Sequence, residues 1–140
     1  MITTAYARAL HPQREWPCML QKGYEKTLEE ILRERAEILF RAGERLSDAL
    51  RELAVIDSKI ERMVTGVAGE SEHGPACPVM YHDINIEIER YNDAREYAKL
   101  RHFYLIVTRE AMGLRRHTWV DEIYRIPPKK KPLKEPHGQV

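Results

Sequence analysis

The chain has few of the residues that secreted, strand-rich or membrane-spanning proteins require. Its two cysteines, Cys18 and Cys77, cannot form a disulfide scaffold, and we expect free thiols in a reducing compartment. The chain has only seven glycines, and aromatic residues make up 8% of it. Both values are low for a β-sandwich, which needs many turns between its strands. The longest apolar run, Phe103 to Val107, is far shorter than the roughly 18 residues that span a bilayer. We therefore expect a cytoplasmic protein without a membrane segment.

The charge of the chain is also balanced. It has 23 lysines and arginines and 22 aspartates and glutamates, a formal net charge of +1. The molecule as a whole therefore has no strong electrostatic preference for nucleic acid or for a membrane surface. A hydrophobic fraction of 43% is too high for a disordered chain, and 140 residues fit one domain.

What the sequence does contain is a long heptad repeat, which predicts a helix over residues 27–65. Thr27 and Glu30 form a capping-box pattern at its start, and Gly66 suits the C′ position after its end. Apolar residues alternate at steps of four and three, which is typical of helices that pack along one seam. The heptad seam comprises Leu28, Leu32, Arg35, Leu39, Ala42, Leu46, Ala49, Leu53, Ile56, Ile60 and Met63, and Arg35 is its one polar member.

A second helix is predicted from about Asp83, a good N-cap, to Arg125, before Pro127. Residues 102–107 could also form a strand, but the charged, helix-favouring sequence on both sides argues for a helix that is buried on every side. Gly113 could end this helix, with Thr118 capping a short piece over residues 119–124; a kink or an unbroken helix is equally compatible. The seam of this segment comprises Ile84, Ile88, Tyr91, Arg95, Ala98, His102, Leu105, Arg109 and Met112.

These segments predict an all-α fold, a long antiparallel two-helix hairpin resembling a coiled coil. Folding about residue 74 pairs residues whose numbers add up to roughly 148, so that Leu46 lies near His102. A hairpin buries only one stripe of each helix, and exposed apolar residues would remain. We therefore expect a homo-oligomer, a dimer forming a four-helix bundle, although residues 1–23 could cover the surface instead. The expected interface comprises Phe103, Tyr104, Val107, Ile31 and Ile38.

Candidate metal and anion sites are sparse. His73, Cys77 and His82, with Cys18 as a fourth ligand, could bind zinc in the loop over residues 66–82, but no close ligand pair supports this. His82–Asp83 resembles the metal-binding dipeptide of phosphohydrolases, although an N-cap explains the aspartate. His102 could be a buried functional histidine. The seam arginines Arg35, Arg95 and Arg109 could surround an anion, or simply reach solvent or pair with glutamates.

The C-terminal region carries the one basic cluster. We interpret residues 1–126 as one helical domain and residues 127–140 as a flexible basic tail in which Leu133 adds nothing to the core. Arg115, Arg116, Lys129, Lys130 and Lys131 could contact a polyanion, or only keep the protein soluble. The favoured function is a protein-interaction or scaffold module. The alternatives are a nucleic-acid accessory protein and a metal-binding or enzymatic bundle; no cofactor is expected.

Overall fold

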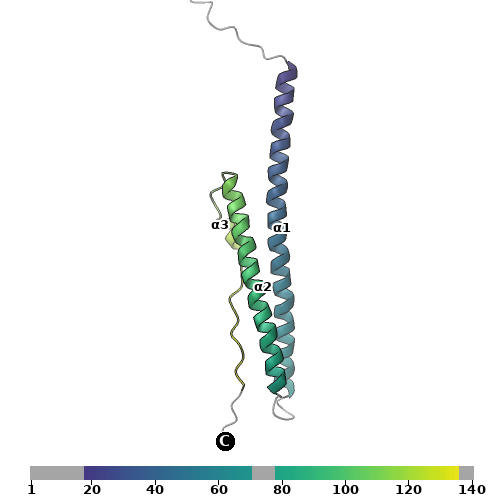
Figure 1. Cartoon of the computed structure of the whole chain (residues 1–140), viewed down its shortest axis with the longest axis vertical. Coiled ribbons are helices and arrows are strands. Elements are labelled where there is room, and N and C mark those ends of the chain that lie inside the picture. The colour runs from purple at the N-terminus through teal and green to yellow at the C-terminus, as the bar shows by residue number, and fades with distance from the viewer. Residues whose placement is uncertain (1–17, 71–77, 136–140) are drawn as a thin grey trace, which may run out of the picture. The chain divides into compact units, whose positions relative to one another are not determined.

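The described part of the chain is entirely helical apart from its connections and its C-terminal segment. A computed structural model describes residues 18–70 and 78–135, and it contains α1 (Cys18–Glu70), α2 (Pro78–Ala111) and α3 (Thr118–Ile123). The chain divides into two compact units, residues 1–36 and 37–140. Within the second unit α1 and α2 pack antiparallel as a hairpin (Figure 1). Among the helices of the described segments, none combines the length and apolarity needed to cross a membrane.

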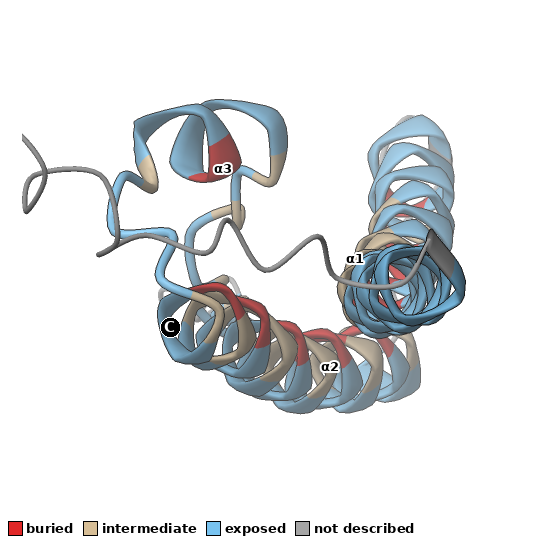
Figure 2. Ribbon diagram, turned by 90° about the horizontal axis from the view of Figure 1, so that it is seen from above, coloured by how far each residue is buried: buried red, intermediate tan, exposed pale blue. Residues whose placement is uncertain are grey.

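The predicted seam forms the core of the hairpin. From α1 it buries Leu46, Ala49, Leu53, Ile56 and Ile60, and from α2 it buries Ile84, Ile88, Tyr91, Ala98 and Leu105. Figure 2 shows the buried residues of α2 as a stripe along one side of the helix. Lys59 and Glu87 form an ion pair of 2.5 Å between the helices, and their numbers add up to 146. The predicted antiparallel register is therefore confirmed to within two residues.

Both ends of α1 extend beyond the prediction of residues 27–65. The helix already begins at Cys18, because a proline just before a helix start is compatible with its first turn. The predicted capping box is wrong, since Thr27 lies inside the helix and its hydroxyl donates to the Gly23 carbonyl. Gly66 does not end the helix either. Val67 continues the heptad seam and is buried, which favours a further turn.

The second helix begins earlier and ends earlier than predicted. It starts at Pro78 rather than Asp83, since a proline suits the first helical position and Met80 packs against the core. Gly113 ends it with φ +83°, a conformation that favours glycine. The Gly113 N–H donates to the Glu110 carbonyl, and the next N–H donates to that of Arg109. This is the Schellman pattern, so the helix is neither kinked nor continuous at this point.

The short helix α3 folds back onto the open end of the hairpin. Val120 is fully buried in one cluster with Leu46 and Leu105. The helix spans Thr118–Ile123, close to the predicted residues 119–124, but Thr118 is its first helical residue and His117 is its N-cap. His102 contacts Asp121 at 3.0 Å, which ties α3 to α2. His102, the candidate functional histidine, is thus held by a contact with α3 inside the fold.

Candidate functional site: an arginine-lined groove between α1 and α2

The two long sides of the hairpin differ in what covers them. In each helix, residues on both sides of the heptad seam face the partner helix. Residues that follow the seam positions, among them Gly43, Asp57, Asn85 and Asn92, lie along one side, which we call the covered flank. Residues that precede the seam positions lie along the other side, which we call the open flank. The open flank includes Ile38, Arg45 and Lys59 of α1 and Glu87, Arg101 and Thr108 of α2.

The C-terminal segment of residues 126–133, here called the strap, lies against the covered flank. Two asparagines of α2 hold it, each donating through its amide N–H and accepting through its side-chain oxygen. Asn92 makes both bonds with the backbone of Lys130 at 3.0 Å, and Asn85 makes both with that of Leu133 at 3.0 and 2.7 Å. Arg95 donates to the Pro127 carbonyl at 2.7 Å. The strap is extended (Figure 1), and it is hydrogen-bonded along its length to α2.

The expectation that this segment adds nothing to the core is wrong. Leu133 packs against the main buried cluster, because the amide bonds of Asn85 hold its backbone beside α2. The interpretation of residues 127–140 as a flexible tail therefore disagrees with the contacts of residues 127–133. Residues 136–140 lie outside the described residues.

Lys130 of the strap contacts both α1 and α2. Its ammonium lies 2.5 Å from Asp57 of α1 and 5.1 Å from the centre of the Tyr91 ring of α2. The hydrogen bond to Asp57 raises the pKa of Lys130, and this effect exceeds the opposing effect of burial. Burial, followed by the charge of Asp57, raises the pKa of the Tyr91 hydroxyl. A lysine considered as a polyanion contact thus pairs with a carboxylate of the fold itself.

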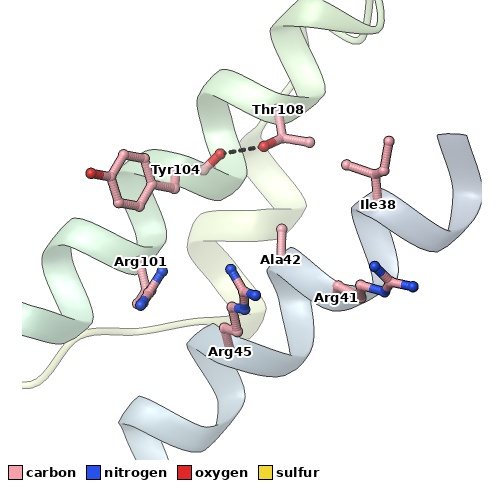
Figure 3. Close-up of a pocket in the computed structure, with 7 residues that line it drawn as sticks. All are labelled: Ile38, Arg41, Ala42, Arg45, Arg101, Tyr104 and Thr108. Atoms are coloured by element: carbon pink, nitrogen blue, oxygen red, sulfur yellow. Dashed lines mark hydrogen bonds between the residues drawn. The ribbon is translucent and has the colours of Figure 1, made fainter.

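The open flank contains a groove of about 420 Å³ near the end of the hairpin that carries α3. Its walls are apolar and cationic side chains of α1 and α2, and no carboxylate is among them (Figure 3). The lining residues are Ile38, Arg41, Ala42, Arg45, Arg101, Tyr104 and Thr108. Its chemistry is that of a recognition surface for a group with negative charge and an apolar neighbourhood.

The register of the hairpin places two arginines opposite each other in this groove. Arg45 precedes Lys59 by two heptads in α1, and Arg101 follows Glu87 by two heptads in α2. By heptad register Arg45 and Arg101 therefore correspond to Lys59 and Glu87, and both line the groove. Figure 3 shows both arginine side chains extending from facing helices into the same space. Opposed like charges at such positions destabilise a helix pair.

The arginines of the groove differ in how far their charges are satisfied. Arg41 pairs with Glu37 of its own helix. Arg101 donates two N–H bonds to the Tyr97 hydroxyl, at 2.8 and 2.6 Å, and stacks over the Tyr97 ring at 4.8 Å. A guanidinium has five N–H groups, so three remain for a ligand. Arg45 makes no hydrogen bond or ion pair with any residue that the structure describes.

The seam arginines do not form the anion pocket considered above. Arg109 is only 8% exposed and closes the turn after α2, donating to the Arg116 carbonyl at 3.0 Å and stacking over Trp119 at 4.5 Å. Arg95 binds the strap, and Arg35 is exposed. Neither solvent exposure nor a glutamate partner accounts for Arg109, because a backbone carbonyl and an aromatic ring hold its guanidinium.

The predicted metal ligands receive no support from the described residues. His73 and Cys77 lie outside them, and His82 is an exposed residue of α2. No group of three or more possible metal-ligating side chains occurs within residues 18–70 and 78–135. Asp83 lies inside α2 rather than at its N-cap.

The candidate polyanion contacts differ in their exposure. Arg115, Arg116 and Lys129 are exposed, whereas Lys130 binds Asp57. Lys131 is an exposed residue of the strap.

All five residues of the predicted interface are exposed: Ile31, Ile38, Phe103, Tyr104 and Val107. Residues of an interface must be exposed in the single chain. The sequence analysis missed Arg45 and Arg101. The expected register, with numbers that add up to roughly 148, pairs Arg45 with Phe103, and only the observed sum of 146 brings Arg101 opposite Arg45.

No protein-family model, no curated protein and no solved structure matches the chain.

Proposed function

We propose that this chain is a helical protein-interaction module that associates with a second copy of itself. The observation that carries the proposal is a second apolar stripe on α2, outside the core. Leu100, Phe103, Tyr104 and Val107 are between 42% and 59% exposed. Their spacing of i, i+3, i+4 and i+7 places them on one face of the helix, which is the pattern of a helix-packing surface.

The energetics favour covering this stripe. Burying one such side chain fully contributes roughly 1.5–3 kcal/mol, and these residues are already partly covered, so each retains a fraction of that gain. Contiguous exposed apolar residues of this kind mark association sites on soluble proteins. Another helical hairpin offers a complementary surface, and a two-fold arrangement would bury the same stripe on both copies.

The first unit of the chain supports the same proposal independently. Residues 19–32 of α1 expose Met19, Leu20, Tyr24, Leu28, Ile31 and Leu32. Leu28 and Leu32 belong to the heptad seam that α2 covers further along α1. The alternative in which the N-terminal residues cover the apolar surface finds no support in Met19 and Leu20, because both side chains are exposed themselves.

The test is the mass of the protein in solution. We expect light scattering at micromolar concentration to give at least twice the chain mass of 16.5 kDa. Phe103→Glu places a charge in the stripe and should shift the protein toward monomer. Ile123→Glu is the matched control, since Ile123 is similarly exposed on α3 outside the stripe. A wild-type monomer at about 100 µM, a concentration at which associations far weaker than a stable dimer are detected, would contradict the proposal.

A further inference from the structure

We propose that the arginine-lined groove binds the acidic face of residues 25–32 of a second copy, with Glu25 and Glu29 as the groups that meet Arg45 and Arg101. This inference rests on the proposed self-association and names the charged contact that would direct it. The partner copy completes the site, because it supplies the carboxylates that the groove lacks.

The groove defines the chemistry of its occupant. Arg45 and Arg101 bring two positive charges together without a carboxylate among the lining residues, while Ile38 and Ala42 provide an apolar wall beside them. An arginine fork matches a carboxylate in geometry as well as in charge. The groove runs between two helices and opens to solvent along its length. A helix that carries acidic residues next to apolar residues fits this combination better than an isolated small anion.

Residues 25–32 of α1 have this combination. Glu25, Leu28, Glu29 and Leu32 follow the i, i+3, i+4, i+7 spacing and therefore share one face. All four side chains are exposed, and neither glutamate makes a hydrogen bond or ion pair with another described residue. Lys26 and Arg33 lie within one turn of Glu29, but neither makes an ion pair with it. The face is thus acidic and apolar, complementary to a groove that is basic and apolar.

The proposed contact explains why a repulsive pair exists in an otherwise regular hairpin. Positions beside the seam of a coiled coil set partner choice through their charges. Lys59 and Glu87 satisfy each other within the chain, so they offer nothing to a partner. Arg45 and Arg101 repel each other until carboxylates lie between them. Association would then relieve the repulsion and select an acidic partner helix.

The experiment exchanges the charges on the two sides of the contact. The groove variant carries Arg45→Glu and Arg101→Glu, and the face variant carries Glu25→Arg and Glu29→Arg. The groove variant keeps a like-charge pair inside the hairpin, so the internal repulsion is matched to the wild type. We expect each variant alone to associate at least about tenfold more weakly than the wild type, because like charges meet in its contact. An equimolar mixture should recover wild-type association, since both contacts become complementary again.

The outcomes separate the inference from the proposed function. Wild-type dimers that survive in both variants would overturn the charged contact and leave self-association standing. A monomeric wild type would overturn both. Arg62→Glu with Arg115→Glu is the control, as both residues are exposed outside the groove. Circular dichroism checks folding. If a reversal unfolds the chain, Arg45→Gln with Arg101→Gln replaces it, and unchanged sedimentation of that variant would count against the contact.

Discussion

Single residues in this hairpin show how position, rather than residue type, decides what a charge does. Lys130, predicted to lie in a flexible tail, is held by Asp57 and lies over Tyr91. Arg109, at a seam position, binds a backbone carbonyl and an aromatic ring at the end of α2. Arg45 and Arg101 face each other instead of a carboxylate. Arg45 makes no hydrogen bond with a described residue and Arg101 bonds only the Tyr97 hydroxyl, which is why this pair defines the candidate site.

The Asp57–Lys130–Tyr91 contact predicts a loss of stability at alkaline pH. The pKa values of Lys130 and Tyr91 are both raised in the folded state, so the folded protein retains protons that the unfolded chain releases. The free energy of unfolding should therefore fall as pH rises above about 10. Because Asp57 contributes to both shifts, Asp57→Asn should flatten this dependence. Urea unfolding at a series of pH values measures it, and equal slopes for both proteins would contradict the assignment.

Arg45→Glu alone should stabilise the isolated hairpin. The substitution replaces one of two like charges in the groove by a carboxylate, at the heptad position that corresponds to the Lys59–Glu87 ion pair. We expect a gain of about 0.5–1 kcal/mol in the free energy of unfolding, measured by urea denaturation at a concentration low enough to keep the protein monomeric. Arg62→Glu, which has no such partner, should give no gain. A destabilised Arg45→Glu protein would mean that Arg45 supports the fold.

At the scale of elements, the sequence predicted the paired regions far better than their ends. The heptad seam and its register depend on many apolar residues at once, and the seam residues between positions 46 and 60 of α1 are buried as expected. The ends depend on single contacts. Val67 and Met80 extend α1 and α2 into the predicted loop because each finds apolar neighbours, which the linear pattern does not reveal.

The strap was missed because its attachment is made of polar side chains at ordinary helix positions. Asn85 and Asn92 look like surface residues of α2 in the sequence, and only the fold brings strap backbone beside them. The candidate groove was missed for a different reason. An anion site was expected at the seam arginines, whereas Arg45 and Arg101 lie beside the seam. A like-charge pair emerges only when both flanks of the two helices are aligned.

Truncation after Ile126 should destabilise the hairpin. It removes six hydrogen bonds between α2 side chains and strap backbone, the Lys130–Asp57 pair and the Leu133 contact. The entropy gained by freeing the strap offsets much of this, so we expect a loss on the order of 1–3 kcal/mol. Thermal unfolding followed by circular dichroism gives the value. Lys134→Ala with Glu135→Ala, which changes two exposed residues beyond the strap, is the control and should leave the melting temperature unchanged.

For the whole molecule, the outer stripe of α2 predicts that stability depends on protein concentration. A protein that associates only when folded gains stability by mass action, so its melting temperature rises with concentration. We expect a clear rise between about 1 µM and about 100 µM for the wild type. Phe103→Glu should remove the dependence while keeping the low-concentration melting temperature. A wild-type melting temperature that is constant over this range would count against self-association.

The spacing of the two asparagines that hold the strap fixes the length of strap that fits between them. Seven residues of helix separate Asn85 from Asn92, a rise of about 10.5 Å. Three residues of extended chain separate Lys130 from Leu133, about 10 Å. One heptad of α2 thus matches three residues of strap, and the two lengths agree only at this ratio. A residue inserted between Lys130 and Leu133 should break one of the two amide clamps.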